Sequence, residues 1–316
     1  MQLRHIVVPL DGSRLAEAAL LMASRIAGGA RATLTLLHVL EEHPPASVHG
    51  QRHLGSAADA GRYLSSLRDG MHAAGHEVLT HVHENTVRDV ARSLADHAAE
   101  LRADLIVMTT HGSGGMRRLV FGSIAQQVIA STACPVLFLP CESSEAQCSP
   151  DTRHVFVPLD GDPLHECAVG LAVALAAALD ATVHLMTVVP NVADLAGSRS
   201  AVARFMPGAA ATALDLEAAA AAAYLAAVRE ACIPRAAGSD PACDAAPDIV
   251  DLVERGDPAR VIQRVVERAD HAMLVMATHR KVGAAAFWSA SVAPRVAAEA
   301  ACPVAMLSVP SPSAAP

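Results

Sequence analysis

Aromatic and cationic side chains are scarce in this sequence of 316 residues. Aromatic residues make up 3% of it, and 24 lysines and arginines face 32 aspartates and glutamates, for a net charge of −8. Nucleic acids and anionic membranes are bound by basic surfaces, so this balance argues against both as general partners. Because large rings are few and 52% of residues are hydrophobic, the core must consist of small aliphatic side chains.

Targeting and disulfide signals are also missing. No apolar run reaches the roughly 18 residues that a membrane-spanning helix needs, and residues 1–12 enter a strand pattern without the features of a signal peptide. The seven cysteines are scattered and odd in number, which favours reduced thiols over a disulfide framework. These absences predict a cytoplasmic protein that does not bind a membrane.

Common catalytic and metal motifs are absent as well. The chain has no Gly-x-Ser-x-Gly elbow, no Walker A lysine and no Gly-x-Gly-x-x-Gly after its first predicted strand. His81 and His83 share one face of a predicted strand, but no cysteine or carboxylate stands near them at ligand spacing. We therefore predict no catalytic residue and no metal ligand.

The sequence contains an internal duplication. His154–Gly161 repeats His5–Gly12 at an offset of 149, and Cys302 follows Cys134 in a second Cys-Pro-Val at an offset of 168. The two offsets differ because the second copy carries 19 extra residues, which we place between 188 and 275. That stretch includes a predicted alanine-rich helix over 209–231 and an irregular segment over 234–247.

The duplication predicts two α/β domains. They cover residues 1–140 and 153–310, with a linker over 141–152 and a disordered tail over 311–316. Apolar strand-like runs alternate with helical runs in each copy, which indicates right-handed crossovers and a doubly wound parallel sheet. The five strands predicted in the first copy begin near Ile6, Thr33, Glu77, Leu105 and Pro135.

A glycine-containing turn follows the fourth predicted strand. Gly112 begins it, and Gly122 precedes Ser123, the predicted N-cap of the next helix. Free amides and the positive end of the dipole make a helix N-terminus favourable for an anion, and Arg117 and Arg118 add positive charge. The pattern indicates a phosphate-binding turn, although an ordinary strand-to-helix connection can have the same glycines.

These motifs resemble those of the universal stress protein family. The spacing from Gly112 to Gly122-Ser123 is similar to the family's Gly-x2-Gly-x9-Gly-Ser/Thr motif, with Thr109 in place of the first glycine. Val-Pro-Leu-Asp-Gly, Ala-Asp-Leu-Ile-Val-Met-Thr-Thr-His-Gly and Cys-Pro-Val extend the resemblance over nearly the whole chain. It implies two Rossmann-like, adenine nucleotide alpha hydrolase-like domains, each with five parallel strands in the order 3-2-1-4-5.

The resemblance implies a nucleotide site in the first copy, at the crevice between strands 1 and 4. Asp11 and the backbone of Val39 would hold the adenine and ribose, and the groups that open the helix at Ser123 would hold the phosphates. The residues implied to contact the nucleotide are Pro9, Asp11, Val39, Met108, Thr109, Gly112, Gly122, Ser123, Ile124 and Ala125.

The implied ligand is ATP, with ADP and AMP as alternatives and Mg²⁺ as a candidate companion ion. In the second copy Asp160 is kept, but Ala277, Arg280 and Ala290 replace the three motif glycines, so we predict a degenerate second site. The implied function is a stress-response sensor or regulator that acts through an unknown protein partner. A scaffold that binds no nucleotide and a weak ATPase are the alternatives.

Two other features of the repeat lead to predictions. The fifth strands, Pro135–Leu139 and Pro303–Leu307, are short apolar edges that we expect to pair antiparallel as an internal pseudo-dimer; the resemblance also allows a homodimer of whole chains. Cys134 and its counterpart are expected to be core residues rather than reactive thiols. His111 and His279 are expected to position the turn rather than act as catalytic bases.

Overall fold

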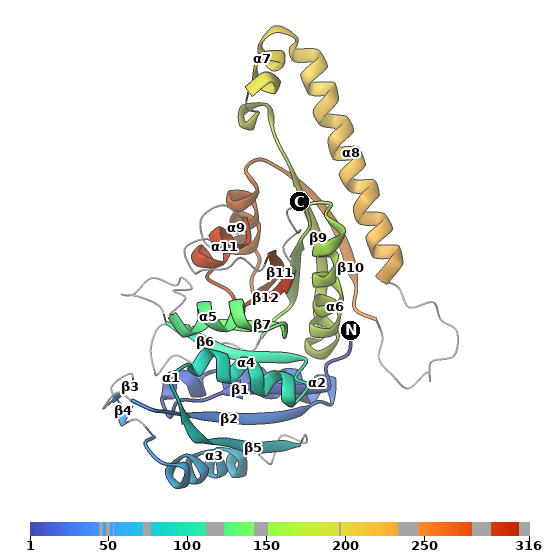
Figure 1. The fold of residues 1–316 in the computed structure, drawn as a ribbon. Coiled ribbons are helices and arrows are strands. Elements are labelled where there is room, and N and C mark those ends of the chain that lie inside the picture. The colour runs from blue at the N-terminus through green and yellow to red at the C-terminus, as the bar shows by residue number, and fades with distance from the viewer. Residues whose placement is uncertain are drawn as a thin grey trace.

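The structure is a computed structural model in which most of both repeats is described. The described residues are 1–43, 47–48, 51–52, 54–71, 77–111, 123–141, 151–195, 197–232, 246–279 and 292–309. Most of the predicted linker and all of the predicted tail lie outside them. The strands within them form one ten-stranded sheet and one two-stranded sheet (Figure 1).

The first half contributes five parallel strands to the large sheet. They are β1 (His5–Pro9), β2 (Thr33–Glu41), β5 (Val78–Val87), β6 (Leu105–His111) and β7 (Val136–Cys141). Their order, β5-β2-β1-β6-β7, is the predicted 3-2-1-4-5. The other elements of this half are α1 (Arg14–Glu17), α2 (Ala19–Ala30), β3 (Ser47–Val48), β4 (Gln51–Arg52), α3 (Ala57–Met71), α4 (Val90–Glu100) and α5 (Ser123–Ser131).

The second half repeats this arrangement in the order β10-β9-β8-β11-β12. Its strands are β8 (His154–Pro158), β9 (Thr182–Val189), β10 (Ile249–Arg255), β11 (Ala272–His279) and β12 (Val304–Val309). Its helices include η2 (Pro163–Glu166), α6 (Cys167–Leu179), η3 (Val192–Asp194), α7 (Gly197–Phe205), α8 (Pro207–Cys232), α9 (Pro258–Arg268) and α11 (Val292–Glu299). The duplicated sequence therefore folds twice in the same topology.

The strands are almost continuously apolar because helices cover the sheet on both faces. In β1, Ile6 and Val8 pack into one core cluster, and Val7 packs into the other. Buried residues of α2, α3, α6 and α8 belong to the first cluster, and those of α4, α5, α9 and α11 belong to the second. Each cluster contains residues of both halves, so the two copies share their cores.

The two halves join edge to edge, as predicted. β7 and β12 pair antiparallel, with Leu137 opposite Ala305. Those two residues are counterparts in the repeat, 168 positions apart, and Val136 and Phe138 pair with the counterparts of each other. The joint therefore has the self-complementary form of a twofold dimer interface, and it makes the sheet mixed and continuous.

The insertion in the second half contains α8, which matches the predicted alanine-rich helix. Residues Leu214, Leu225 and Val228 form a buried stripe on it, and the helix contacts β9 and β10. Figure 1 shows α7 and the first turns of α8 extending beyond the sheet, where Phe205 is 86% exposed. The segment 233–245 lies outside the described residues.

Helix α8 corrects one expectation from the sequence. Its 26 residues include an 18-residue window with mean hydropathy 1.4, so by length and composition it is apolar enough to cross a membrane. Asp215 and Glu217 interrupt the window, so it contains no uninterrupted apolar run of 18 residues even though its mean hydropathy is high. The cytoplasmic location stays a prediction.

Candidate functional site

A crevice opens in each half where the central strands separate. β1 and β6 pair at only two positions, Ile6 with Leu105 and Val7 with Ile106, although β6 continues to His111. In the second half β8 and β11 pair at three positions, and β11 continues beyond them. The strand order reverses at these two places, and the crevice beyond the carboxyl ends of such strands is where open α/β sheets bind ligands.

The first-half crevice brings together several residues predicted to bind a nucleotide. Pro9 ends β1 opposite Leu37 of β2, and Asp11 follows two residues later. Val39 lies two residues beyond Leu37 and is buried. Met108 and Thr109 lie in β6 and are partly exposed. These side chains therefore reach the same edge of the sheet from three adjacent strands.

The remaining predicted residues lie at or beyond the start of α5. Gly112 and Gly122 are outside the described residues. Helix α5 begins at Ser123 itself rather than after it. Ile124 is 42% exposed and Ala125 is buried, so one residue of the first turn faces solvent and the next faces the core.

Hydrogen bonds between side chains and backbone hold the turn after β1. The Ser13 amide donates to Asp11 Oδ1 over 2.9 Å, and Ser13 Oγ accepts from the amide of Ala16 over 3.1 Å, which caps α1. Gly12 adopts φ +88°, a conformation that costs glycine little. His38 Nδ1 lies 2.7 Å from the Leu10 carbonyl oxygen and donates to it. Asp11 is therefore fixed at the mouth of the crevice.

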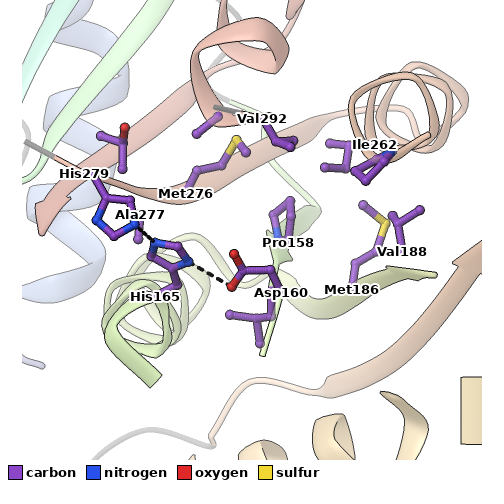
Figure 2. Close-up of a pocket in the computed structure, with 14 residues that line it drawn as sticks. Pro158, Asp160, His165, Met186, Val188, Ile262, Met276, Ala277, His279 and Val292 are labelled. Atoms are coloured by element: carbon purple, nitrogen blue, oxygen red, sulfur yellow. Dashed lines mark hydrogen bonds and ion pairs between the residues drawn. The ribbon is translucent and has the colours of Figure 1, made fainter. Parts of the chain in front are cut away.

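The second-half crevice is a cavity of about 330 Å³ (Figure 2). Seven of its lining residues are the repeat counterparts of predicted nucleotide-binding residues in the first half. They are Pro158, Asp160, Val188, Met276, Ala277, Val292 and Ala293. The internal repeat thus places a cavity where the sequence predicts a nucleotide site, but in the copy that lacks the motif glycines.

One wall of this cavity is a polar cluster that the sequence did not reveal. His165 Nδ1 lies 2.8 Å from Asp160 Oδ1, and His165 Nε2 lies 3.2 Å from His279 Nε2. Ligand atoms of Asp162, His165 and His279 all lie within 4.8 Å of one another. The opposite wall is apolar and includes Met186 and Ile262. Figure 2 shows the two imidazole rings facing each other at one end of the cavity.

The sequence signal that could have revealed this cluster is a difference between the two repeats. Ser13 and Ala16 stand in the first half where Asp162 and His165 stand in the second. His279 is 114 residues from His165, too far along the chain for a spacing rule to connect them. Comparison of aligned copies, rather than a motif search, would have identified the cluster.

A second histidine group lies in the first half, on β5 and α4. His97 Nε2 lies 2.9 Å from His83 Nδ1, and His97 Nδ1 lies 3.0 Å from Glu100 Oε2. Burial lowers the pKa of His81, and the nearby His97 and His83 lower that pKa further. His81 and His83 share a strand face as predicted, and the packing of α4 adds the third ring.

Both cysteines of the Cys-Pro-Val repeats have raised pKa values. Burial raises the pKa of Cys134 to about 12, and it raises the pKa of Cys302 to about 12 as well. Cys134 Sγ also donates to the Ala103 carbonyl oxygen over 3.2 Å. A thiol that stays protonated is a poor nucleophile, in agreement with the prediction that these are core residues.

The fold, the duplicated crevice and the internal twofold joint define a protein with two tandem Rossmann-like domains, a doubly wound topology in which nucleotides commonly bind at the crevice. The model of the universal stress protein family matches residues 2–140 and 151–308. The chain therefore belongs to the universal stress protein family, with two tandem copies of its domain.

Individual relatives match one copy at a time. Universal stress protein Sll1654 of Synechocystis is 31% identical over 137 residues, covering 43% of this chain and 85% of that protein. Universal stress protein Rv2319c of Mycobacterium tuberculosis is 30% identical over 146 residues, covering 43% of this chain and 48% of that protein. The match thus spans about half the length of the mycobacterial relative.

A solved structure resembles the whole tandem arrangement. A universal stress protein from Archaeoglobus fulgidus superimposes with a TM-score of 0.65 at 13% identity, covering 98% of this chain and 99% of the other. At that identity the likeness concerns the fold. It shows that a similar arrangement of two halves occurs in another member of the family.

Proposed function

We propose that the first half binds an adenine nucleotide, ATP with Mg²⁺, and that a protein partner responds to its occupancy. The observation that carries the proposal is the early separation of β1 and β6, which pair at two positions only. Asp11 and Thr109 stand just beyond that separation. Family membership and the motif around Gly112 and Gly122 support the same site.

Each group in the crevice has a chemical role in this proposal. The Asp11 carboxylate accepts hydrogen bonds from ribose hydroxyls, and the Val39 backbone contacts the adenine edge. The first amides of α5 point toward the phosphates, where the helix dipole favours negative charge. Thr109 replaces a glycine, and its hydroxyl adds a polar contact beside the ribose.

The first half is the better nucleotide site because it keeps Gly112 and Gly122 and has no histidine at the repeat position of His165. Asp160 accepts from His165 in the second half, whereas Ala16 stands at the position of that histidine in the first half. The motif glycines are also present in the first half alone. We therefore expect one nucleotide per chain.

Calorimetric titration with ATP and Mg²⁺ tests the proposal. Ile124 is exposed in the first turn of α5, so Ile124→Glu favours the helix through its dipole but repels a bound phosphate. We expect one site per chain, with affinity reduced at least about tenfold in Ile124→Glu, a loss of about 1.4 kcal/mol. Ile124→Gln is the neutral control of similar size and should bind nearly as the parent does.

A matched substitution in the second half identifies the site. Val292 is the repeat counterpart of Ile124 and begins α11, so Val292→Glu should leave ATP affinity unchanged. If it weakens binding and Ile124→Glu does not, the nucleotide occupies the second half. If millimolar ATP gives neither heat nor thermal stabilisation, the chain is better described as a scaffold.

A further inference from the structure

The histidine cluster of the second half is held in place by its own loop. Asp162 Oδ1 accepts from the Leu164 amide over 2.9 Å and caps η2. His165 lies in that same turn, and His279 ends β11 beside it. The turn and the strand end are packed against each other. The three side chains therefore belong to two elements in contact, since Asp162 caps η2, His165 lies in η2 and His279 ends β11.

The hydrogen bonds of His165 determine which of its nitrogens has a free lone pair. Asp160 can only accept, so His165 Nδ1 carries the proton and donates to Oδ1 over 2.8 Å. In the neutral ring Nε2 then has its lone pair aimed at His279 (Figure 2). A carboxylate that accepts from the second nitrogen of an imidazole is the usual partner of a metal-binding histidine.

The separation of the two rings suits a shared metal ion. The two Nε2 atoms lie 3.2 Å apart. Two imidazole nitrogens at about 2.0–2.1 Å from one tetrahedral zinc ion lie about 3.3 Å apart, as the tetrahedral angle requires. His165 and His279 therefore already have the separation of two ligands on a single ion.

We propose that the second half binds a divalent transition-metal ion of the zinc class through His165, His279 and Asp162, with Asp160 orienting His165. The ligand atoms lie within 4.8 Å of one another, so a rotation of the Asp162 carboxylate completes a three-ligand set. His165 and His279 line the cavity of about 330 Å³, so an ion bound to them lies beside that cavity. Three protein ligands with an open position are typical of zinc sites that bind water or a small ligand.

The cluster is not needed for the shared fold. The first half has the same topology with Ser13 and Ala16 at the corresponding positions. The arrangement without a metal ion is a single hydrogen bond from His279 Nε2 to His165 Nε2, and it leaves His279 Nδ1, a buried atom, without a partner among the described residues. Metal titration distinguishes the two arrangements.

The test uses the full chain without an affinity tag, stripped of metal and free of nucleotide. Zn²⁺ is titrated in competition with a chromophoric chelator, and Co²⁺ is added separately as a spectroscopic probe. We expect one ion per chain and the strong visible absorption of tetrahedral Co²⁺. His165→Ala, which installs the residue of the first half, and His279→Gln should each abolish both signals.

A graded variant and a control make the result specific. Asp160→Asn keeps an acceptor beside His165 but removes the charge, and should weaken Zn²⁺ binding about 10–100-fold. His184→Gln changes another histidine pair, whose His154 Nδ1 and His184 Nε2 atoms are 3.0 Å apart. No described carboxylate is bonded to either ring, so this variant should bind the ion as the parent does.

Thermal unfolding monitored by circular dichroism verifies that each variant is folded. If the parent chain binds Zn²⁺ no better than His165→Ala does, or if His184→Gln loses the ion instead, the proposed site is wrong. The titration contains no nucleotide, so its failure leaves the first-half proposal untouched.

Discussion

At the scale of single residues, histidines are the most informative part of this chain. Two pairs of imidazole rings lie within hydrogen-bond distance: His165 with His279 at the carboxyl edge of the sheet, and His154 with His184 on the neighbouring strands β8 and β9. The surroundings of the two pairs differ. His165 has a carboxylate on its far nitrogen. His184 instead stacks on Phe156, with ring centroids 4.6 Å apart. The same side chain therefore suits a metal site in one place and neutral packing in the other.

The packing of a neutral His184 ring against Phe156 predicts that the stability of the protein depends on pH. Burial lowers the pKa of His184, and His154 lowers it further, so protonation favours the unfolded chain. The stabilising effect of the neutral ring is complete above about pH 6.5, the ordinary histidine value, and is lost as pH falls through the lower folded value. The melting temperature should therefore fall between pH 7.5 and 5.

The variant His184→Gln should show a smaller fall in melting temperature over that range, measured by circular dichroism in matched buffers. His43, which is exposed, provides the control, and His43→Gln should follow the parent curve. An identical pH dependence in His184→Gln and the parent chain would contradict the assignment.

At the scale of elements, α2 and α6 make a close contact across the two halves. A Cβ atom on Gly29 would lie 1.9 Å from the Ala178 carbonyl oxygen. Gly29 and Ala178 are repeat counterparts, 149 positions apart. The paired residues at the centre of the β7–β12 joint, Leu137 and Ala305, are also repeat counterparts, at the offset of 168. The contact therefore lies on the internal twofold axis, where the missing Cβ of Gly29 allows the helices to approach so closely.

This contact predicts opposite effects for two glycine-to-alanine changes. Gly29→Ala forces α2 and α6 apart, and overpacking of this kind costs about 1–3 kcal/mol. Gly61→Ala lies in α3, where a new Cβ meets nothing within 4 Å, and should stabilise the protein by about 0.5–1 kcal/mol through helix propensity. Urea denaturation measures both. Equal effects of the two changes would mean that the helices are not in contact in solution.

Helix α8 has a buried side and an exposed apolar side. Leu225 is fully buried against the sheet, whereas Leu216 is 66% exposed. Only 22% of its most apolar window is buried inside the protein. The helix thus packs against the sheet through a narrow stripe of buried residues, and its first turns carry exposed apolar side chains beyond the sheet.

At the scale of the whole molecule, the continuous sheet predicts that both halves unfold together. β7 and β12 pair across the joint, and both core clusters contain residues of each half. Opening either half would expose apolar surface and an unpaired edge of the other. Hydrogen exchange followed by mass spectrometry should give the same opening free energy for β1 and β8, equal to that from urea denaturation.

Two separated opening energies would instead indicate independent domains. Gly29→Ala serves as the internal comparison, because it should lower the protection of both strands rather than of β1 alone. A decrease confined to the first half would contradict the cooperative description.

Much of this architecture could be predicted from the sequence because it depends on local and repeated patterns. Alternating apolar and helical runs predicted two doubly wound parallel sheets, the resemblance to the universal stress protein family implied the order 3-2-1-4-5, and the short apolar fifth strands predicted the joint of β7 with β12. The crevice residues of the first half, such as Asp11 and Val39, were implied by the resemblance, and Asp11 also lies just past a strand end, where the topology favours a site. The membrane-length character of α8 was missed because Asp215 and Glu217 interrupt its apolar run.

The sequence by itself determined the duplicated fold and its twofold joint, because periodicity and repetition are properties of order along the chain. Only the tertiary structure decided that His165 and His279 face each other at 3.2 Å and that Gly29 meets Ala178. These contacts join residues separated by more than a hundred positions. Their closeness depends on how strand ends and helix faces are brought together, and spacing in the sequence does not contain that information.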